Sequence, residues 1–225
     1  MPGRGSRQDK NAAGAGRLKY GNCLLLGQRV MARTRAENFD DIKATILSSA
    51  AQLFAQKGFR NTNIIDIGNA CNASKSRMYH YFGSKELMLE AMLLEHVNGL
   101  LAIAREITET EADPQEKFQS FVLAHLRYYY AAPDRHKVLL ADAEYLPEAA
   151  QAEVRRAEHR LVELLIVILK QLNAQRFSSR QEASAHAMLI YGMLNWTYTW
   201  YRPSGKLGID ALAHKAAAMC LQGIL

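Results

Sequence analysis

The spacing of apolar residues predicts helices along the chain from about residue 37 to its end. From Ile42 onward, apolar positions recur every three or four residues, which is the period of a helix with one buried face. After residue 83, further helices are predicted over residues 84–110, 114–131, 134–145, 147–175, 180–201 and 209–223, separated by prolines, serines and glycines. No window gives a convincing run of alternating strands. The pattern therefore predicts an all-α protein.

The first strong helix covers the residues around 40–57. Its apolar stripe consists of Ile42, Ile46, Leu47, Ala50, Leu53 and Phe54. Asp40 and Asp41 stand near its start, where negative charge is favourable, and Gly58 is predicted to end it as a C-terminal cap.

Two short helices follow, and a sharp turn separates them. Asn63 is a good N-cap with Asp66 three residues later, in a variant of the capping box. Asn72 tolerates the left-handed backbone conformation that a sharp turn requires, and Ser74 can cap a second helix that starts at Lys75. This arrangement predicts a helix-turn-helix.

The second short helix has one apolar and one polar side. Met78 and Phe82 fall on the inner face, whereas Ser76 and His80 point outward. A helix this short is held by packing rather than by its own hydrogen bonds, and its polar side suits the major groove of DNA. Lys75 and Ser76 are predicted to face base edges. The remaining predicted DNA-binding residues, which hold phosphates or cap the helix, are Thr62, Asn63, Ser74, Arg77, Tyr79, His80, Tyr81 and Lys85.

The distribution of charge agrees with a polyanionic partner. The 225 residues have a formal charge of +6, of which residues 1–36 hold +7, so that the other 189 residues sum to −1. Residues 57–85 nevertheless carry five Lys or Arg side chains against Asp66 alone. Such a patch either binds nucleic acid or forms a solvated basic face, and the helix-turn-helix pattern favours nucleic acid.

Residues 1–36 contain glycines and scattered basic side chains without a helical period, and are predicted to be a disordered basic arm. Because Met31 directly precedes the first strong helix, residues 1–30 either come from an upstream start or form an arm that touches DNA.

Cysteine usage and hydropathy predict a cytoplasmic protein. Cys23, Cys71 and Cys220 stand alone, without a C-x-x-C pair or nearby histidines at ligand spacing, so that neither a disulfide framework nor a metal site is expected. No cofactor motif is present. The densest apolar run, residues 161–172, is too short for the ~20 residues of a membrane span. No membrane partner is therefore expected.

The helix-turn-helix region resembles the DNA-binding domain of the TetR family of transcriptional regulators. The matching positions are Gly58, Thr62, Ile67, Ser74, Tyr79, Phe82, Lys85, Glu86 and Leu87. Where the family usually has Ala, Ala, Gly and Val, this chain has Gly68, Cys71, Asn72 and Ala73, and Arg77 replaces a typical Thr. The replacements at 68–73 are small or compatible with a turn, whereas Arg77 bears on base preference.

The resemblance implies a division into residues 37–84 for DNA binding and residues 85–225 for ligand binding and dimerisation. In the family, the last two long helices usually form a four-helix bundle across a two-fold axis, so this chain is expected to bind an inverted-repeat operator as a homodimer. The residues offered for close packing there are Ala183, Ala187, Met188, Tyr191, Met193, Leu212, Ala216, Met219 and Leu221, some of which belong to the internal core.

Residues 194–213 resemble a subgroup that responds to acyl-coenzyme A thioesters. Trp196 and Trp200 lie one helical turn apart and could form a wall for an acyl chain, while Arg202 could pair with a phosphate; alternatively both tryptophans are core residues and Arg202 is a C-terminal counter-charge. His125 and Tyr129 share one helical face that either lines a pocket or belongs to the core. The full predicted ligand set is Leu101, Arg105, His125, Tyr129, Glu144, Trp196, Trp200 and Arg202.

The predicted function is a repressor that a small hydrophobic effector, an acyl-coenzyme A or a related apolar acid, releases from DNA. A multidrug-sensing repressor of the same fold is the alternative. A DNA-binding protein without an effector would lack an internal cavity. A helical enzyme acting on an anionic substrate is the competing class, although no H-E-x-x-H, G-x-S-x-G or P-loop pattern occurs and the protein is expected not to be an enzyme.

Overall fold

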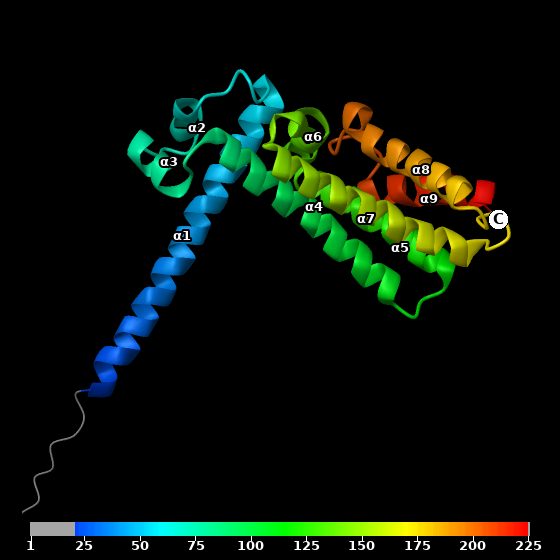
Figure 1. Ribbon diagram of the computed structural model, residues 1–225, viewed down its shortest axis with the longest axis horizontal. Helices are drawn as coiled ribbons and strands as arrows, with labels where there is room; N and C mark the ends of the chain where they lie inside the picture. The colour runs from blue at the N-terminus through cyan, green and yellow to red at the C-terminus, as the bar shows by residue number, and fades with distance from the viewer. Residues whose placement is uncertain (1–20, 225) are drawn as a thin grey trace, which may run out of the picture. The chain divides into compact units, whose positions relative to one another are not determined.

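The computed structural model describes the backbone of residues 21–224 and the side chains of residues 39–224. Within that range all regular structure is helical, which confirms the all-α prediction (Figure 1). The elements are α1 (Gly21–Lys57), α2 (Ile64–Ala70), α3 (Lys75–Tyr81), α4 (Lys85–Glu109), α5 (Pro114–Ala131), α6 (Pro133–Asp142), the 3-10 helix η1 (Ala143–Tyr145), α7 (Glu148–Leu172), α8 (Arg180–Trp200) and α9 (Ile209–Ile224).

Helix α1 is longer than the sequence pattern predicts. It is helical from Gly21, so the prediction of a disordered arm is wrong for residues 21–36, while residues 1–20 lie outside the described part. Residues 21–36 contain leucine, arginine, methionine and alanine but no proline, so a helix nucleated further along can extend through them. The chain divides into two compact units, Met1–Lys43 and Ala44–Leu225, and the features below lie in the second unit.

Gly58 ends α1, as predicted. Its φ is +82°, in the left-handed region, and its backbone N–H donates a hydrogen bond of 2.8 Å to the carbonyl of Phe54. This conformation turns the chain toward α2 without a clash from a side chain.

Replacing Gly58 with alanine should lower the free energy of unfolding by about 1–2 kcal/mol, because an L-residue in the left-handed region carries that strain. Urea titration followed by circular dichroism measures the change. Gly208, whose φ is not positive and which has open space where a side chain would begin, is the matched control and should change little on the same substitution. Equal stability of wild type and Gly58→Ala would contradict the capping role.

The helix-turn-helix forms as its sequence predicts. The Asn63 side chain accepts hydrogen bonds from the backbone N–H groups of Ile65 and Asp66, and the Asp66 carboxylate accepts one from the Asn63 N–H, which completes the capping box. Asn72 has a φ of 54°, and the Ser74 hydroxyl accepts a hydrogen bond from the Arg77 N–H. These local bonds fix the angle between α2 and α3.

The larger part of the fold is a helical bundle. Helix α4 packs against α5, α6 and α7, α5 packs against α9, and α7 packs against α8. Phe118, Phe121 and Leu165 are among its fully buried core residues. Of the described residues, only helix α4 is long and apolar enough to cross a membrane, but half of its apolar window is buried in the fold, as in a core helix of a soluble protein.

The helix predicted over residues 134–145 is divided. Helix α6 ends at Asp142, and η1 follows with a tighter turn in which the Leu146 N–H donates to the Ala143 carbonyl at 3.2 Å. Pro147 explains why helical structure ends after η1, because a proline disfavours helical geometry in the residue before it, and Leu146 is extended.

Candidate DNA-binding surface and ligand cavity

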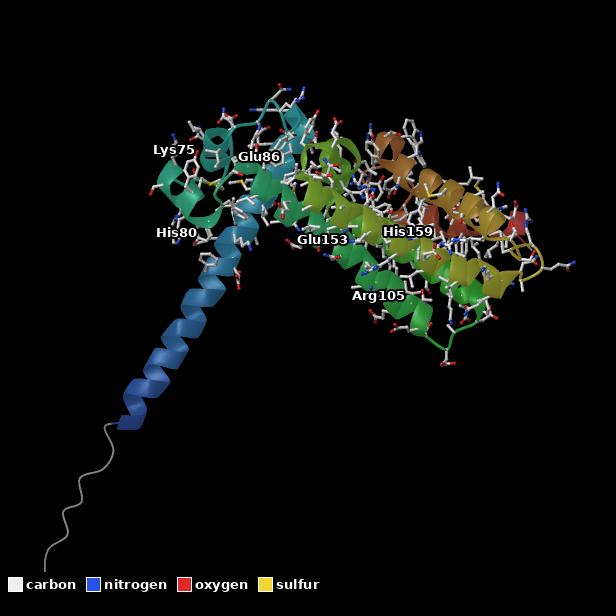
Figure 2. The ribbon with its side chains drawn as sticks, viewed as in Figure 1. Lys75, His80, Glu86, Arg105, Glu153 and His159 are labelled. Carbon is white, nitrogen blue, oxygen red and sulfur yellow. The ribbon has the colours of Figure 1, made fainter. Side chains whose placement is uncertain are left out.

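One side of α3 is exposed and polar. Lys75, Ser76, Arg77, Tyr79 and His80 are all exposed, whereas Met78 on the opposite side is fully buried. The ammonium of Lys75 lies 6.0 Å from the centre of the Tyr79 ring. Figure 2 shows Lys75 and His80 projecting from α3 away from the helical bundle. The buried side of the helix therefore anchors it, and the exposed side is available to a partner.

A hollow of about 480 Å³ lies beside α3. It is lined by Arg60, Asn61, Thr62, Asn63, Ile64, Ile65, Lys75, Tyr79, Gly83, Ser84, Lys85 and Glu86. The start of α4 lies in this hollow, and the Ser84 hydroxyl caps it by accepting from the Leu87 N–H at 3.2 Å. Backbone N–H groups at the start of a long helix attract anions, so the hollow suits a phosphate. Asn61 was not predicted from the sequence, because no pattern separates it from other loop residues.

The prediction that Thr62 contacts phosphate is wrong for its side chain. Thr62 is only 1% exposed, and its hydroxyl donates a hydrogen bond of 3.0 Å to the carbonyl of Gly58. The hydroxyl is directed inward because it satisfies a carbonyl left open at the end of α1. Thr62 therefore stabilises the loop.

Lys85 also forms hydrogen bonds within the protein. Its ammonium donates hydrogen bonds to the carbonyls of Phe59 at 2.9 Å and Thr62 at 3.1 Å, and it lies 4.3 Å from the centre of the Phe59 ring. These contacts use two of its three donors to hold the loop after α1 against the start of α4. Lys85 therefore positions the loop at the edge of the hollow, and its third donor is left for the predicted phosphate contact.

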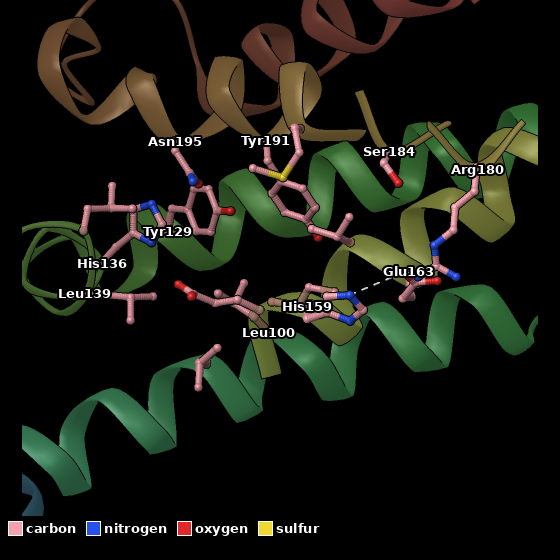
Figure 3. A pocket seen from close by; sticks show the side chains of 16 residues that line it. Leu100, Tyr129, His136, Leu139, His159, Glu163, Arg180, Ser184, Tyr191 and Asn195 are labelled. Atoms are coloured by element: carbon pink, nitrogen blue, oxygen red, sulfur yellow. Dashed lines mark hydrogen bonds and ion pairs between the residues drawn. The ribbon is translucent and has the colours of Figure 1, made fainter. Parts of the chain in front are cut away.

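A cavity of about 500 Å³ lies within the helical bundle (Figure 3). Its lining comes from α4, α5, α6, α7 and α8: Val97, Leu100, Tyr129, His136, Leu139, Leu140, Glu158, His159, Leu161, Val162, Glu163, Arg180, Ser184, Met188, Tyr191 and Asn195. Seven of these sixteen side chains are those of Val, Leu or Met, and the other nine carry a polar or charged group. The volume is typical of a small-molecule site.

The two ends of the cavity differ in chemistry. Figure 3 shows Tyr129, His136 and Asn195 together at one end, and Glu163 and Arg180 at the other. The Glu163 carboxylate forms an ion pair with Arg180, and His159 lies 3.8 Å from the same carboxylate. The first group defines what we call the neutral end, although the Glu158 carboxylate lies near it: burial, and then the charge of Glu158, raise the pKa of Tyr129. The other end holds an ion pair.

Three buried histidines surround the neutral end. Burial lowers the pKa of His125 to about 4 and that of His96 to about 4, with the charge of Arg135 adding to the effect on His96. Burial, followed by repulsion from the other two histidines, lowers the pKa of His136 to about 3. All three imidazoles are therefore neutral at pH 7.

Hydrogen bonds and ring contacts organise this end. The Nδ1 of His125 donates to the Phe121 carbonyl at 2.8 Å, so its neutral ring presents Nε2 as an acceptor to the Tyr191 hydroxyl at 3.4 Å. The rings of Tyr129 and His136 stack with centroids 3.6 Å apart. These contacts explain why polar side chains are tolerated so deep in the bundle.

Of the eight predicted ligand residues, only Tyr129 lines the cavity. His125 lies behind it and contacts Tyr191, while Leu101 is buried outside the lining and Arg105 is exposed (Figure 2). The remaining four predictions are not supported by position. Glu144 is exposed in η1, Trp196 and Trp200 are 63% and 52% exposed, and Arg202 donates to the carbonyls of Thr199 and Tyr201 as a C-terminal cap.

The sequence missed His136, Leu139 and Asn195, which all line the cavity. Their periodicity is that of ordinary amphipathic helices, and a helical pattern does not reveal which buried faces leave space between them. Among the residues with described side chains, no cluster of three or more His, Cys, Asp or Glu could hold a metal ion.

The helix-turn-helix exposes α3, and the helical bundle that follows contains a cavity. Together these features define a DNA-binding protein of the helix-turn-helix class with a site large enough for a small ligand. Two family models match the chain: "Bacterial regulatory proteins, tetR family" over residues 46–92 and "Tetracyclin repressor-like, C-terminal domain" over residues 111–224. The chain belongs to the TetR family and is a transcriptional repressor of that type. Members of this family are regulators, not enzymes.

Individual relatives extend over most of the chain. The HTH-type transcriptional repressor KstR2 of Mycobacterium tuberculosis is 27% identical over 188 residues, which cover 81% of this chain and 92% of KstR2. A TetR-family regulator from Bordetella parapertussis has 38% identity and a TM-score of 0.77, over 80% of this chain and 94% of that structure. AibR, solved in complex with isovaleryl coenzyme A and operator DNA, has the same fold with a TM-score of 0.69 and 21% identity, over 79% of this chain and 97% of AibR.

Proposed function

We propose that this protein is a homodimeric, cytoplasmic repressor that binds an inverted-repeat operator and is released when a small hydrophobic effector occupies the cavity. The proposed effector class is an acyl-coenzyme A or a related apolar acid. Residues 37–84 supply the DNA-binding domain, and residues 85–225 supply the effector site and the dimer interface.

The position of α4 carries this proposal. The helix begins at the hollow beside α3, where Lys85 holds the preceding loop, and its residues Val97 and Leu100 line the cavity. A ligand that displaces these two side chains moves the same rigid helix that supports the DNA-binding surface.

Helix α6 and η1 provide a second connection. His136 and Leu139 line the cavity, while the neighbouring Lys137 donates a hydrogen bond of 2.6 Å to the Ala55 carbonyl in α1. The Tyr145 ring stacks on Phe59 with centroids 5.5 Å apart. An effector with a 100-fold preference for the non-binding conformation supplies about 2.7 kcal/mol of coupling per site through such contacts.

The proposed dimer interface is an exposed apolar face of α8 and α9. Leu189 is 72% exposed, and Met188, Trp196, Trp200 and Met219 are also exposed. Several residues predicted for this interface are instead buried in the protomer core: Ala183, Ala187, Tyr191, Leu212, Ala216 and Leu221. Large apolar side chains in such a patch are typical of a protein interface. The two-fold arrangement would match the two halves of an inverted repeat.

The cavity favours an apolar ligand with an anionic end. The side chains of its Val and Leu residues suit an acyl chain, and the guanidinium of Arg180, which already pairs with Glu163, is the cationic group that an anion would share. The structural relative AibR was solved with isovaleryl coenzyme A, which is an example of this ligand class in the same fold. Glu158 also lines the cavity and would favour the alternative, a cationic drug.

The test is a screen of acyl-coenzyme A thioesters, free fatty acids and cationic aromatic drugs by thermal shift, followed by operator release. We expect thioesters both to stabilise the protein and to free the DNA. Val162→Trp should block this response, because Val162 is a half-buried residue of the lining, whereas Val167→Trp, exposed on α7 outside the lining, should not. Stabilisation and release by the cationic drugs alone would replace the acyl proposal with a multidrug sensor.

Replacing Lys75 with alanine should reduce the ratio of operator affinity to random-DNA affinity by about tenfold, because one contact to a base edge contributes about 1–3 kcal/mol of discrimination. Lys85→Ala should instead weaken both complexes alike by loosening the loop after α1. Fluorescence anisotropy at several salt concentrations measures both effects, and binding should fall steeply with salt. Lys206→Ala, in the exposed loop before α9, is the control. An unchanged ratio in Lys75→Ala would contradict its role.

A further inference from the structure

Two buried polar atoms at the neutral end of the cavity have no hydrogen-bond partner among the described residues: His136 Nε2 and Asn195 Oδ1. Both residues line the cavity, and His136 is only 2% exposed. Buried polar atoms are nearly always paired, and an unpaired one carries a desolvation penalty that a suitable ligand group would remove. The hydrogen-bonding capacity of these two atoms therefore indicates which ligand group would fit between them.

The neighbouring hydrogen bonds limit what this end can offer. Because His125 donates through Nδ1, its Nε2 accepts a hydrogen bond from the Tyr191 hydroxyl. The Tyr191 oxygen can therefore only accept a hydrogen bond from a ligand. Asn195 Oδ1 is also an acceptor. A ligand without a donor would leave both oxygens unpaired.

The Nε2 of His136 is a donor or an acceptor according to which ring of the His96–His136 pair carries the shared proton. The Nδ1 of His136 lies 3.4 Å from His96 Nε2, and both rings are neutral, so one of the two nitrogens donates to the other. When His96 is the donor, the proton of His136 is on Nε2 and is directed to the cavity. Figure 3 shows the end of the Asn195 side chain beside the stacked rings of His136 and Tyr129.

We infer that His96 donates to His136, and that the effector carries a hydroxyl group that lies at this end of the cavity, accepts from His136 Nε2–H and donates to Asn195 Oδ1. This completes a chain from His96 through His136 and the ligand to Asn195. A carbonyl or ether oxygen satisfies only the His136 donor, and a methyl group satisfies neither atom. The inference deepens the proposed function, since it concerns the effector that this cavity binds.

Isothermal titration calorimetry with 1-octanol, 2-octanone, 1-methoxyoctane and octane tests the inference without DNA. We expect 1-octanol to bind at least tenfold more tightly than each of the other three, because only the alcohol combines a donor with an acceptor. Binding of 1-octanol and 2-octanone within twofold of one another, or no binding of 1-octanol, would overturn the inference.

Variants locate the effect. Asn195→Leu should abolish the preference for 1-octanol over 2-octanone, and His136→Phe, which can still stack on Tyr129, should weaken both ligands. Asn195→Leu should unfold at the wild-type temperature or above in the absence of ligand, because it removes an unpaired polar atom. His136→Phe should unfold at a lower temperature, because it also removes the partner of His96 Nε2. Ser184→Ala removes a hydroxyl elsewhere in the lining and should keep the preference. If His136→Phe does not fold, Asn195→Leu decides: a retained preference overturns the inference.

Operator release is scored separately. A tenfold preference for 1-octanol combined with failure of every screened compound to release DNA would contradict the proposed regulation and leave the hydroxyl site supported. Release of DNA by thioesters, combined with equal binding of 1-octanol and 2-octanone, would support the proposed regulation and overturn the hydroxyl site.

Discussion

Replacing Leu189 with glutamate is expected to convert the repressor into a monomer and to lower operator affinity by at least 100-fold. Leu189 is 72% exposed in the protomer, and it lies on the apolar face of α8 and α9 that we propose as the dimer interface. Burial of one leucine side chain contributes about 1.5–3 kcal/mol, and this contribution is lost twice because both protomers of a two-fold dimer carry the substitution. The two carboxylates would in addition be buried without partners.

Sedimentation equilibrium and gel shift with the inverted repeat measure the two consequences of Leu189→Glu. Leu189→Met keeps the volume and polarity of the side chain and should remain dimeric. Val167→Glu introduces the same charge at a residue of α7 that is 42% exposed, and should also remain dimeric. A dimeric Leu189→Glu protein with normal operator affinity would exclude this face as the interface.

Mild acid is expected to destabilise the protein strongly. The pKa values of His96 and His125 fall to about 4 and that of His136 to about 3, so the unfolded chain binds three protons below pH 6.5 that the folded chain does not. The free energy of unfolding therefore decreases as the pH falls from 6.5 toward 4. Between pH 7 and pH 5 the three groups together remove about 5 kcal/mol, a large share of a typical domain stability.

Urea unfolding at pH 5, 6 and 7 measures this dependence. His125→Asn should reduce the change in the free energy of unfolding between pH 7 and pH 5 by about one third, because one of the three groups no longer takes up a proton. The comparison uses the pH dependence of stability, so the packing lost in the variant at every pH does not affect it. His214, an exposed histidine of α9, is the control for substitution to asparagine. The same pH dependence in wild type and His125→Asn would contradict the burial of a neutral imidazole.

The local features of the DNA-binding surface could be predicted from the sequence because adjacent residues determine them. The capping box at Asn63, the left-handed turn at Asn72 and the cap at Ser74 each depend on hydrogen bonds within a few positions. The inner and outer faces of α3 follow from the helical period alone. The inward bond of the Thr62 hydroxyl and the loop contacts of Lys85 were not predicted from the sequence, because these groups bond to carbonyls at and after the end of α1, and the bonds of Lys85 cross more than twenty positions of sequence.

The sequence by itself determined the all-helical architecture, the order of the helices and the helix-turn-helix, since periodicity, capping residues and prolines act locally. Only the tertiary structure decided which side chains share the cavity. Tyr129, His136 and Asn195 come from α5, α6 and α8, and their convergence depends on how three amphipathic helices pack. Trp196 and Trp200 have an equally apolar local pattern, yet they lie largely exposed on α8. A helix specifies the direction of each side chain relative to its own axis, and packing against the other helices decides whether that direction leads into the core, into a cavity or to the surface.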